Sequence, residues 1–358
     1  MTELLTPNSF TKLAYQAFQQ GKASFGLAHK TISTELLKWT NPPTSERTPQ
    51  NLDIKILNQV RLRMNEVIEA DWQDAEQGVY PVSLLFENPW TEVFQYYPVL
   101  WFDMNGIQER ANRKQYQTFS SEVDTEGYPR YYLQNFHHQT DGYLSDMSAN
   151  LYDLQVDILF NGGADAMRRR VLAPLKQGLR KFNEVSSKQI RVLDVATGTG
   201  RTLRYLRATL PQASLYGLDL SPAYLRKANQ FLSQIEGELP QLVQGKAEET
   251  PYQDEYFHGV TSVFLFHELP PQIRKDVIQE CFRILKPGGV LVLCDSIQAE
   301  DFPEIRPMLE NFPVTFHEPY YQHYITDNLV EHLEVAGFKD ITTQTHFVSK
   351  YWIAHKPA

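Results

Sequence analysis

The sequence predicts an α/β fold, a mainly parallel sheet covered by helices, preceded by a mainly helical, aromatic-rich N-terminal extension. Three observations predict it. Residues 190–195 form a short β-branched apolar run that is typical of a central parallel strand. Gly198 and Gly200 follow at once, and leucines then recur at helical spacing over 201–210. Strand-like and helix-like segments go on alternating toward residue 355, which is the pattern of a parallel α/β sheet.

The first strand and turn, IRVLDVATGTG at 190–200, are predicted to form a nucleotide-binding loop at a helix N-terminus. Glycine lets the backbone turn sharply and approach a ligand closely. A dinucleotide-binding fingerprint needs a third glycine, whereas this chain has Leu203 at that position. About 20 residues on, SLYGLDL ends a second strand with Asp219, where an acid would hold a ribose diol. A glycine turn without any ligand is the alternative.

The D-x-x-x-G-x-G arrangement that begins at Asp194, followed by the acid at 219, resembles motif I and the acidic second motif of the class I S-adenosylmethionine (SAM)-dependent methyltransferases. The resemblance extends from near Asn150 to the C-terminus. It implies a Rossmann-like sheet of seven strands, six parallel and one antiparallel, with SAM as the cofactor. The cofactor-binding residues implied are Asp194, Ala196, Thr197, Gly198, Gly200, Asp219, Leu220, Ala247, Glu248, Phe264 and Tyr152.

Later segments follow the family's order. Ser221 and Pro222 open a helix with a capping hydroxyl and a proline at its first position. LPQLVQGKAEETPY resembles the third strand and the adenine-contacting loop, usually G-D-A-E-x-L-P-F in the relatives. Lys246 replaces the acid there, so we expect the backbone of Ala247 and the side chain of Glu248 to recognise adenine.

The remaining strands are predicted from three further segments. HGVTSVFLFHELPP is a fourth strand that delivers His267 and Glu268 to its carboxyl end, where open α/β sheets bind ligands. ILKPGGVLVLCD resembles the family's post-motif segment and contains strand five. A helix over 327–336 then leads to KDITTQTH and SKYWIAHK, which we read as strands six and seven.

Upstream of the loop, SANLYDLQVDILF is most like the ubiquinone and menaquinone C-methyltransferases, and this likeness implies that Tyr152 lies over the SAM methionyl group. The alternative is that Tyr152 only packs its helix on the sheet. The basic run 168–170 is interpreted as a solvated helix face, with contact to the SAM carboxylate as the alternative.

Composition limits the classes of function. A chain of 358 residues suits two domains or one enlarged domain, and 42% apolar residues can form a substantial core. No apolar run approaches the ~20 residues that cross a bilayer, and MTELLTPNSF lacks the features of a signal peptide. We therefore expect no integral membrane segment and a cytoplasmic location.

A net charge of −9 without a basic stripe argues against nucleic acid as a partner. Cys281 and Cys294 are expected to pack in the core.

We place the domain boundary near residue 145, with an accessory region at 1–145 and a SAM-dependent methyltransferase domain at 146–358. Residues 9–38 predict one or two helices broken around Gly21 and Gly26, followed by the polar linker TNPPTSERTPQN. Residues 52–72 predict a second amphipathic helix, which pairs within the protomer or across a homodimer. The accessory region would serve as a lid, an acceptor pocket or a dimerisation unit.

The stretch from Tyr80 to Tyr132 is rich in aromatic residues, and its three Tyr-Pro pairs are expected to break it into short pieces. As a lid or acceptor pocket, its rings would stabilise a sulfonium charge by cation–π contact, worth about 0.5–2 kcal/mol. The alternative is that these rings only pack the accessory region against the sheet.

Three histidines are the catalytic candidates: His267, and His137 and His138 in NFHHQTDGYLSD. Near an acceptor, each could act as a general base at neutral pH. No metal site is expected, because adjacent histidines seldom converge on one ion and neither C-x-x-C nor H-E-x-x-H spacing accompanies them. The segment TFHEPYYQHYITD is expected to add another pocket wall.

The sequence therefore predicts methyl transfer from SAM to a small-molecule acceptor, by C- or O-methylation, with an aromatic or quinol acceptor favoured. A non-catalytic SAM-binding scaffold is one alternative. An NAD-dependent oxidoreductase is another, although Leu203 disfavours it. Protein methylation also stays open, although FHELPP stands where an amide-methylating enzyme has N-P-P-Y.

Overall fold

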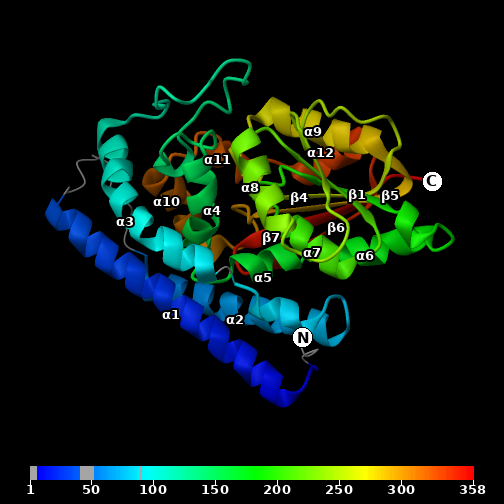
Figure 1. The fold of residues 1–358 in the computed structure, drawn as a ribbon, viewed down its shortest axis with the longest axis horizontal. Helices are drawn as coiled ribbons and strands as arrows, with labels where there is room; N and C mark the ends of the chain where they lie inside the picture. The colour runs from blue at the N-terminus through cyan, green and yellow to red at the C-terminus, as the bar shows by residue number, and fades with distance from the viewer. Residues whose placement is uncertain (1–5, 41–51, 89) are drawn as a thin grey trace.

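The computed structural model describes residues 6–40, 52–88 and 90–358, and at its centre lies a seven-stranded sheet of order β3-β2-β1-β4-β5-β7-β6 (Figure 1). The strand β7 runs antiparallel to both neighbours, and all other neighbouring pairs are parallel. This confirms the predicted sheet of six parallel strands and one antiparallel strand. The strands are β1 (Arg191–Val195), β2 (Ser214–Asp219), β3 (Gln241–Gln244), β4 (Phe257–Val263), β5 (Leu285–Ser296), β6 (Lys339–His346) and β7 (Ser349–His355).

Helices cover both faces of the sheet. One layer contains α9 and α12, and the other contains α6, α7 and α8. The helices of this part are α4 (Asp146–Leu159), α5 (Ala164–Arg169), α6 (Leu172–Gly178), α7 (Arg201–Thr209), α8 (Pro222–Leu232), α9 (Pro271–Ile284), α10 (Arg306–Thr315), α11 (Tyr321–Tyr324) and α12 (Leu329–Ala336). As the sequence predicts, Ser221 caps α8 by accepting a hydrogen bond from Tyr224 N, and α12 ends at Gly337, which has φ 106°.

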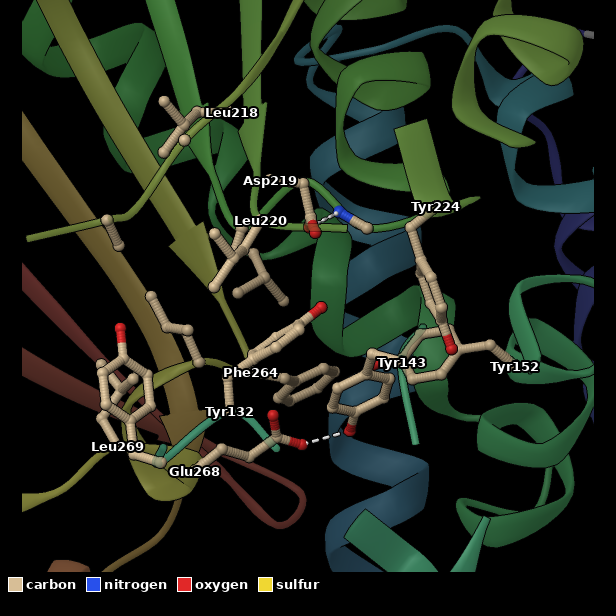
Figure 2. Close-up of a pocket in the computed structure, with 17 residues that line it drawn as sticks. Tyr132, Tyr143, Tyr152, Leu218, Asp219, Leu220, Tyr224, Phe264, Glu268 and Leu269 are labelled. Carbon is tan, nitrogen blue, oxygen red and sulfur yellow. Dashed lines mark hydrogen bonds between the residues drawn. The ribbon is translucent and has the colours of Figure 1, made fainter. Parts of the chain in front are cut away.

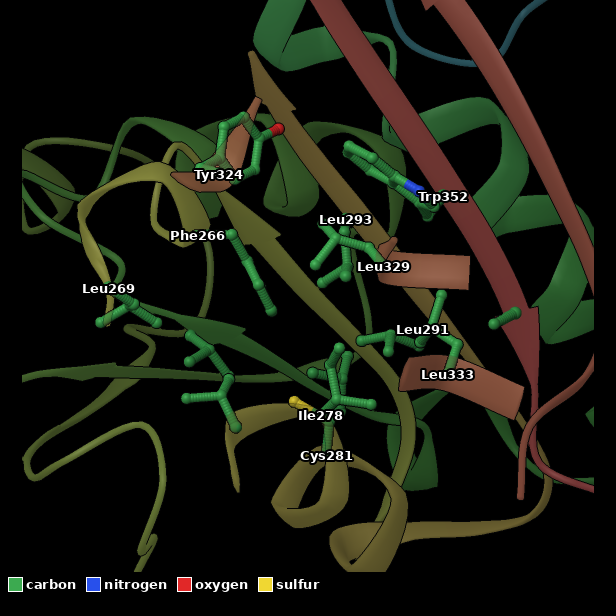
Figure 3. Close-up of a cluster of buried hydrophobic side chains, with 14 of the residues drawn as sticks. Phe266, Leu269, Ile278, Cys281, Leu291, Leu293, Tyr324, Leu329, Leu333 and Trp352 are labelled. Atoms are coloured by element: carbon green, nitrogen blue, oxygen red, sulfur yellow. The ribbon is translucent and has the colours of Figure 1, made fainter. Parts of the chain in front are cut away.

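The two faces of the sheet form two buried cores because side chains along a strand alternate in direction. On β5, Leu291 and Leu293 pack toward α9, α12 and Trp352 (Figure 3), while Val290 and Val292 pack toward α6 and α7. Cys281 and Cys294 are buried and unpaired, one in each core, as expected for packing residues.

The N-terminal region contains the long helices α1 (Ser9–Thr40), α2 (Ile54–Glu76) and α3 (Trp90–Arg113), which lie beside the sheet domain (Figure 1). The predicted break around Gly21 and Gly26 is wrong, because α1 is continuous. Gly26 instead lets α1 approach the chain after α4, since a Cβ there would lie 3.2 Å from Asn161 Cα. The helix predicted at 52–72 is confirmed as α2, and most of the polar linker lies outside the described residues.

The predicted break at the second Tyr-Pro pair is also wrong, because Pro98 lies inside α3. The ring of Tyr97 contacts Phe25 and His29 of α1 and Trp101 of α3 itself. These contacts hold the helix in place, although the proline removes one backbone donor.

The basic run 168–170 is not a solvated face, which corrects the interpretation from sequence. Arg169 is 1% exposed and forms a bidentate ion pair with Asp71 of α2, at 2.9 and 2.6 Å. The hydroxyls of Tyr15 and Tyr80 donate to the same carboxylate at 2.5 and 2.7 Å. Sequence periodicity could not show that the acids of α2 face this run. The buried pair joins the N-terminal helices to the sheet domain.

Candidate active site

The turn after β1 has left-handed backbone at three positions. Ala196, Gly198 and Gly200 all have positive φ, at 56°, 57° and 83°. A Cβ on Gly198 would meet no other atom within 4 Å, so this position opens onto free space. A Cβ on Gly200 would instead lie 3.0 Å from Leu232 Cδ1, so this glycine lets α8 pack against the loop.

Asp219, the last residue of β2, faces the same space (Figure 2). Its Oδ2 accepts a hydrogen bond from Gly198 N at 2.8 Å, and its Oδ1 accepts one from Ser221 N at 2.9 Å. Burial raises the pKa of Asp219 to about 6, and the backbone donors of Ser221 and Gly198 oppose the rise. The carboxylate therefore links the glycine turn to the second strand.

These residues line a cavity at the carboxyl ends of the parallel strands, which we call the loop cavity. Seven of the predicted cofactor residues line it: Tyr152, Ala196, Gly198, Asp219, Leu220, Ala247 and Phe264. Its other walls include residues that the sequence did not single out for this role: Tyr131, Tyr132, Tyr143, Tyr224, Glu268 and Leu269. Three of the tyrosines, Tyr143, Tyr152 and Tyr224, meet edge to face with ring centroids 5.5–6.0 Å apart (Figure 2).

Four other predicted residues do not line the loop cavity: Asp194, Thr197, Gly200 and Glu248. Asp194 is 1% exposed, and its carboxylate accepts hydrogen bonds from Thr261 and Thr197, each at 2.8 Å. Burial raises the pKa of Asp194 to about 7. Asp194 therefore stabilises the turn through its hydrogen bond with Thr197, on the side away from the loop cavity. The Glu248 side chain accepts a hydrogen bond from Tyr131 at 2.6 Å.

A second, largely apolar cavity of about 370 Å³ lies next to the first, and we call it the apolar cavity. It shares Tyr152, Phe264 and Glu268 with the loop cavity. Its walls come from α1, α2, α4, α10 and the β6–β7 turn, and include Leu27, Val60, Val156, Phe160, Met308, Phe312, Phe347 and Val348. A molecule in one cavity would therefore meet a molecule in the other across three shared side chains.

A polar cluster of His137, His267, Glu268 and Glu318 lies at this junction. His267 Nδ1 is 2.7 Å from Asp295 Oδ1, and although burial opposes it, this carboxylate raises the pKa of His267 to about 10. Burial and the nearby Glu318 raise the pKa of Glu268, which also accepts a hydrogen bond from Tyr143 (Figure 2). His137 lines the apolar cavity with φ 53°, a strained conformation that is found often at functional sites.

The structure separates the two adjacent histidines. His138 lines neither cavity, and its ring instead lies 6.0 Å from those of Tyr116 and His317. Burial lowers the pKa of His138 to about 4. Of the three catalytic candidates, His137 and His267 thus come together and His138 does not. No spacing along the sequence indicates that Glu318 lies near His137 or His267.

Comparison with known proteins identifies the domain around this site. The family model described as a methyltransferase domain matches residues 192–289, which include the glycine turn, Asp219 and the end of β4. This part of the chain is a methyltransferase domain.

Curated relatives match part of this chain over part of their own lengths. The chain is 34% identical to demethylmenaquinone methyltransferase of Thermotoga maritima over 43% of this chain and 60% of that protein. It is 37% identical to phthiotriol/phenolphthiotriol dimycocerosates methyltransferase 1 of Mycobacterium ulcerans, over 37% and 46%. It is 30% identical to sarcosine/dimethylglycine N-methyltransferase of Halorhodospira halochloris, over 51% and 62%. The matches thus span roughly half of these relatives, whose names cover lipid-like and small amine substrates.

No helix in residues 6–40, 52–88 and 90–358 is both long and apolar enough to cross a bilayer.

Proposed function

We propose that the protein transfers a methyl group from SAM, held in the loop cavity, to an oxygen-bearing aromatic or quinol-like acceptor in the apolar cavity. The observation that carries this proposal is the adjacency of the two cavities across Tyr152, Phe264 and Glu268. One cavity has the features of a nucleoside site, and the other has mainly hydrocarbon walls.

The loop cavity fits SAM in its residue chemistry. Gly198 leaves open the place that a Cβ would occupy, so a ligand can approach the backbone there. Asp219 presents a carboxylate to accept hydrogen bonds from a ribose diol, and Leu220 and Ala247 would flank the adenosine. Asp194 and Thr197 would act by positioning the turn. SAM supplies an electrophilic methyl group on a sulfonium, and the faces of Tyr143 and Tyr152 suit such a cation.

The apolar cavity supports an aromatic acceptor. Phe160, Phe264, Phe312 and Phe347 supply ring surfaces, while His137, His267 and Glu268 bring polar atoms to the end that adjoins the loop cavity. An acceptor hydroxyl placed at that end would release its proton to the Glu268 carboxylate as the methyl is transferred. Rate would come mainly from aligning the acceptor and excluding water.

The alternative of a non-catalytic SAM-binding scaffold predicts a cofactor site without an adjoining acceptor cavity, which the apolar cavity disfavours. The oxidoreductase alternative is disfavoured by the methyltransferase match and by Leu203, which is fully buried in the core beneath the turn.

The proposal is tested by calorimetry with SAM and S-adenosylhomocysteine, followed by turnover of methyl-labelled SAM with phenols, hydroquinones and small amines. We expect saturable SAM binding, loss of at least about tenfold in affinity in Asp219→Ala, and label transfer to a phenol or hydroquinone. Transfer to amines alone would overturn the acceptor class. Binding without transfer to any acceptor would favour the scaffold.

A further inference from the structure

The polar cluster has the geometry of a metal-binding site. Its four side chains each offer a ligand atom, and these atoms all lie within 4.8 Å of one another. His137 Nε2 is 3.0 Å from Glu318 Oε1 and 3.9 Å from Glu268 Oε1, and His267 Nε2 is also 3.9 Å from Glu268 Oε1. Ligand atoms about 2.0–2.2 Å from one ion lie roughly 3–4.4 Å apart. A small contraction would therefore place all four around one ion.

Glu318 supplies an independent indication of a missing ligand. Its side chain is fully buried, yet neither carboxylate oxygen makes a hydrogen bond in the described structure. The imidazole of His137, whose Nε2 lies 3.0 Å from Glu318 Oε1, is the charged partner of this carboxylate. Buried carboxylates are normally hydrogen-bonded, paired or bound to metal. Glu318 is therefore a buried carboxylate that pairs with an imidazole of the same cluster and has no hydrogen-bond donor on Oε2.

The orientation of His267 is also fixed by a carboxylate outside the cluster, as is usual for metal-ligating histidines. Asp295 holds His267 through Nδ1 at 2.7 Å, which leaves Nε2 for the cluster. Asp295 is itself fixed by the backbone N–H groups of Phe266 and Ser296, each at 2.7 Å. Such a carboxylate–histidine arrangement sets the ring orientation of a ligating histidine.

We propose that His137, His267, Glu268 and Glu318 bind one divalent first-row transition ion. Two imidazoles with two carboxylates suit Mn²⁺, Fe²⁺, Co²⁺ or Zn²⁺ better than Mg²⁺ or Ca²⁺, which prefer oxygen ligands alone. The two carboxylates also balance the ion's charge. The expectation of no metal site rested on the pair His137–His138, whereas His137 meets partners from two distant segments.

Three of the ligands line the apolar cavity, so an open coordination position would face the acceptor. The ion would then hold a hydroxyl or keto oxygen of the acceptor beside the loop cavity. This role rests on the proposed function, whereas ion binding itself does not. The cluster would otherwise be an ion-pair network of two imidazolium and two carboxylate groups without a metal.

Binding is measured on the full-length chain after treatment with a chelator, without SAM or acceptor. Co²⁺ is titrated alone, and its visible absorption and equilibrium dialysis report coordination and stoichiometry. We expect one Co²⁺ per chain and at least a tenfold weaker Kd in Glu318→Gln and His267→Gln. His138→Gln is the matched control, because its ring lies in the same loop outside the cluster. No stoichiometric binding, or equal binding by Glu318→Gln, would overturn the site.

A second measurement guards against misfolded variants. Circular dichroism establishes that each variant is folded, and the same Co²⁺ concentration should raise the Tm of the wild type more than that of Glu318→Gln. An equal rise in both proteins would contradict the site. SAM calorimetry separates the two proposals: Co²⁺ binding without SAM binding would overturn only the proposed function, and SAM binding without a Co²⁺ site would overturn only the metal.

Discussion

At the scale of single residues, the loop cavity depends on groups that sequence spacing reveals and on others that it hides. Gly198, Asp219 and Ala247 could be located because their distances along the chain follow from a strand–turn–helix unit. The placement of Asp194 could not, since its partner Thr261 lies on a neighbouring strand. Nor could Glu318 be linked to His137, because only the folded chain brings those segments together.

The ionisation of Asp219 should control SAM affinity. Burial raises its pKa to about 6, and only the carboxylate form accepts both ribose hydroxyls. As pH falls below about 6 the protonated form dominates, so affinity should drop by up to about tenfold per pH unit. Calorimetry between pH 5 and 8 measures this change. Asp219→Asn should bind weakly and lose this pH dependence; an unchanged profile in the variant would show that another group titrates.

The two glycines of the turn should respond differently to alanine. Gly198→Ala adds strain of roughly 1–2 kcal/mol and places a methyl group in open space, so SAM affinity should fall while the fold survives. Gly200→Ala adds the same strain and a contact 3.0 Å from Leu232, so the free energy of unfolding should fall further. Urea denaturation and SAM calorimetry on both variants measure the difference. Equal stability loss would refute the division of roles.

At the scale of elements, the central strands followed from continuous apolar runs, because both of their faces are buried, and the later helices followed from apolar periodicity, because each buries one face. The N-terminal helices were harder to predict. Helix breaks were predicted at Gly26 and Pro98, but tertiary contacts with Asn161 and around Tyr97 keep α1 and α3 continuous. Local propensity was overridden by packing.

The ion pair between α2 and Arg169 should be a main link between the two regions. Asp71→Ala leaves a fully buried guanidinium and two tyrosine hydroxyls without their carboxylate, which should lower the free energy of unfolding by about 3–5 kcal/mol. Glu69→Ala breaks the partly exposed pair with Lys12 and a hydrogen bond from Gln73, and should cost less than about 1 kcal/mol. Chemical denaturation compares them, and similar losses in the two variants would contradict this view of the interface.

At the scale of the whole molecule, the sheet domain alone does not enclose the apolar cavity. Leu27 of α1 and Val60 of α2 form part of its wall together with Phe312 and Phe347. The sequence favoured a division near residue 145, with an acceptor pocket among the roles of the first region. We propose that these helices act as a wall of the acceptor site.

A larger side chain on the α1 part of the cavity wall should weaken acceptor binding without changing SAM binding. Leu27→Trp enlarges a half-exposed wall residue, so KM for the acceptor should rise by roughly tenfold while the SAM Kd stays constant. Leu13→Trp, at an exposed position of the same helix outside the cavity, is the control and should leave both unchanged. A matched rise in the SAM Kd of Leu27→Trp would mean that the helix supports the whole site instead.

The shared wall of Tyr152, Phe264 and Glu268 separates two cavities that are lined by different parts of the chain. The loop cavity includes residues of the turns after β1 and β2, such as Gly198 and Asp219, whereas α1 and α2 contribute only to the apolar cavity. Specificity can therefore diverge by exchanging α1 and α2 side chains without disturbing methyl-donor recognition. Engineers seeking new acceptors have a corresponding place to begin: a small library at 27, 57 and 60.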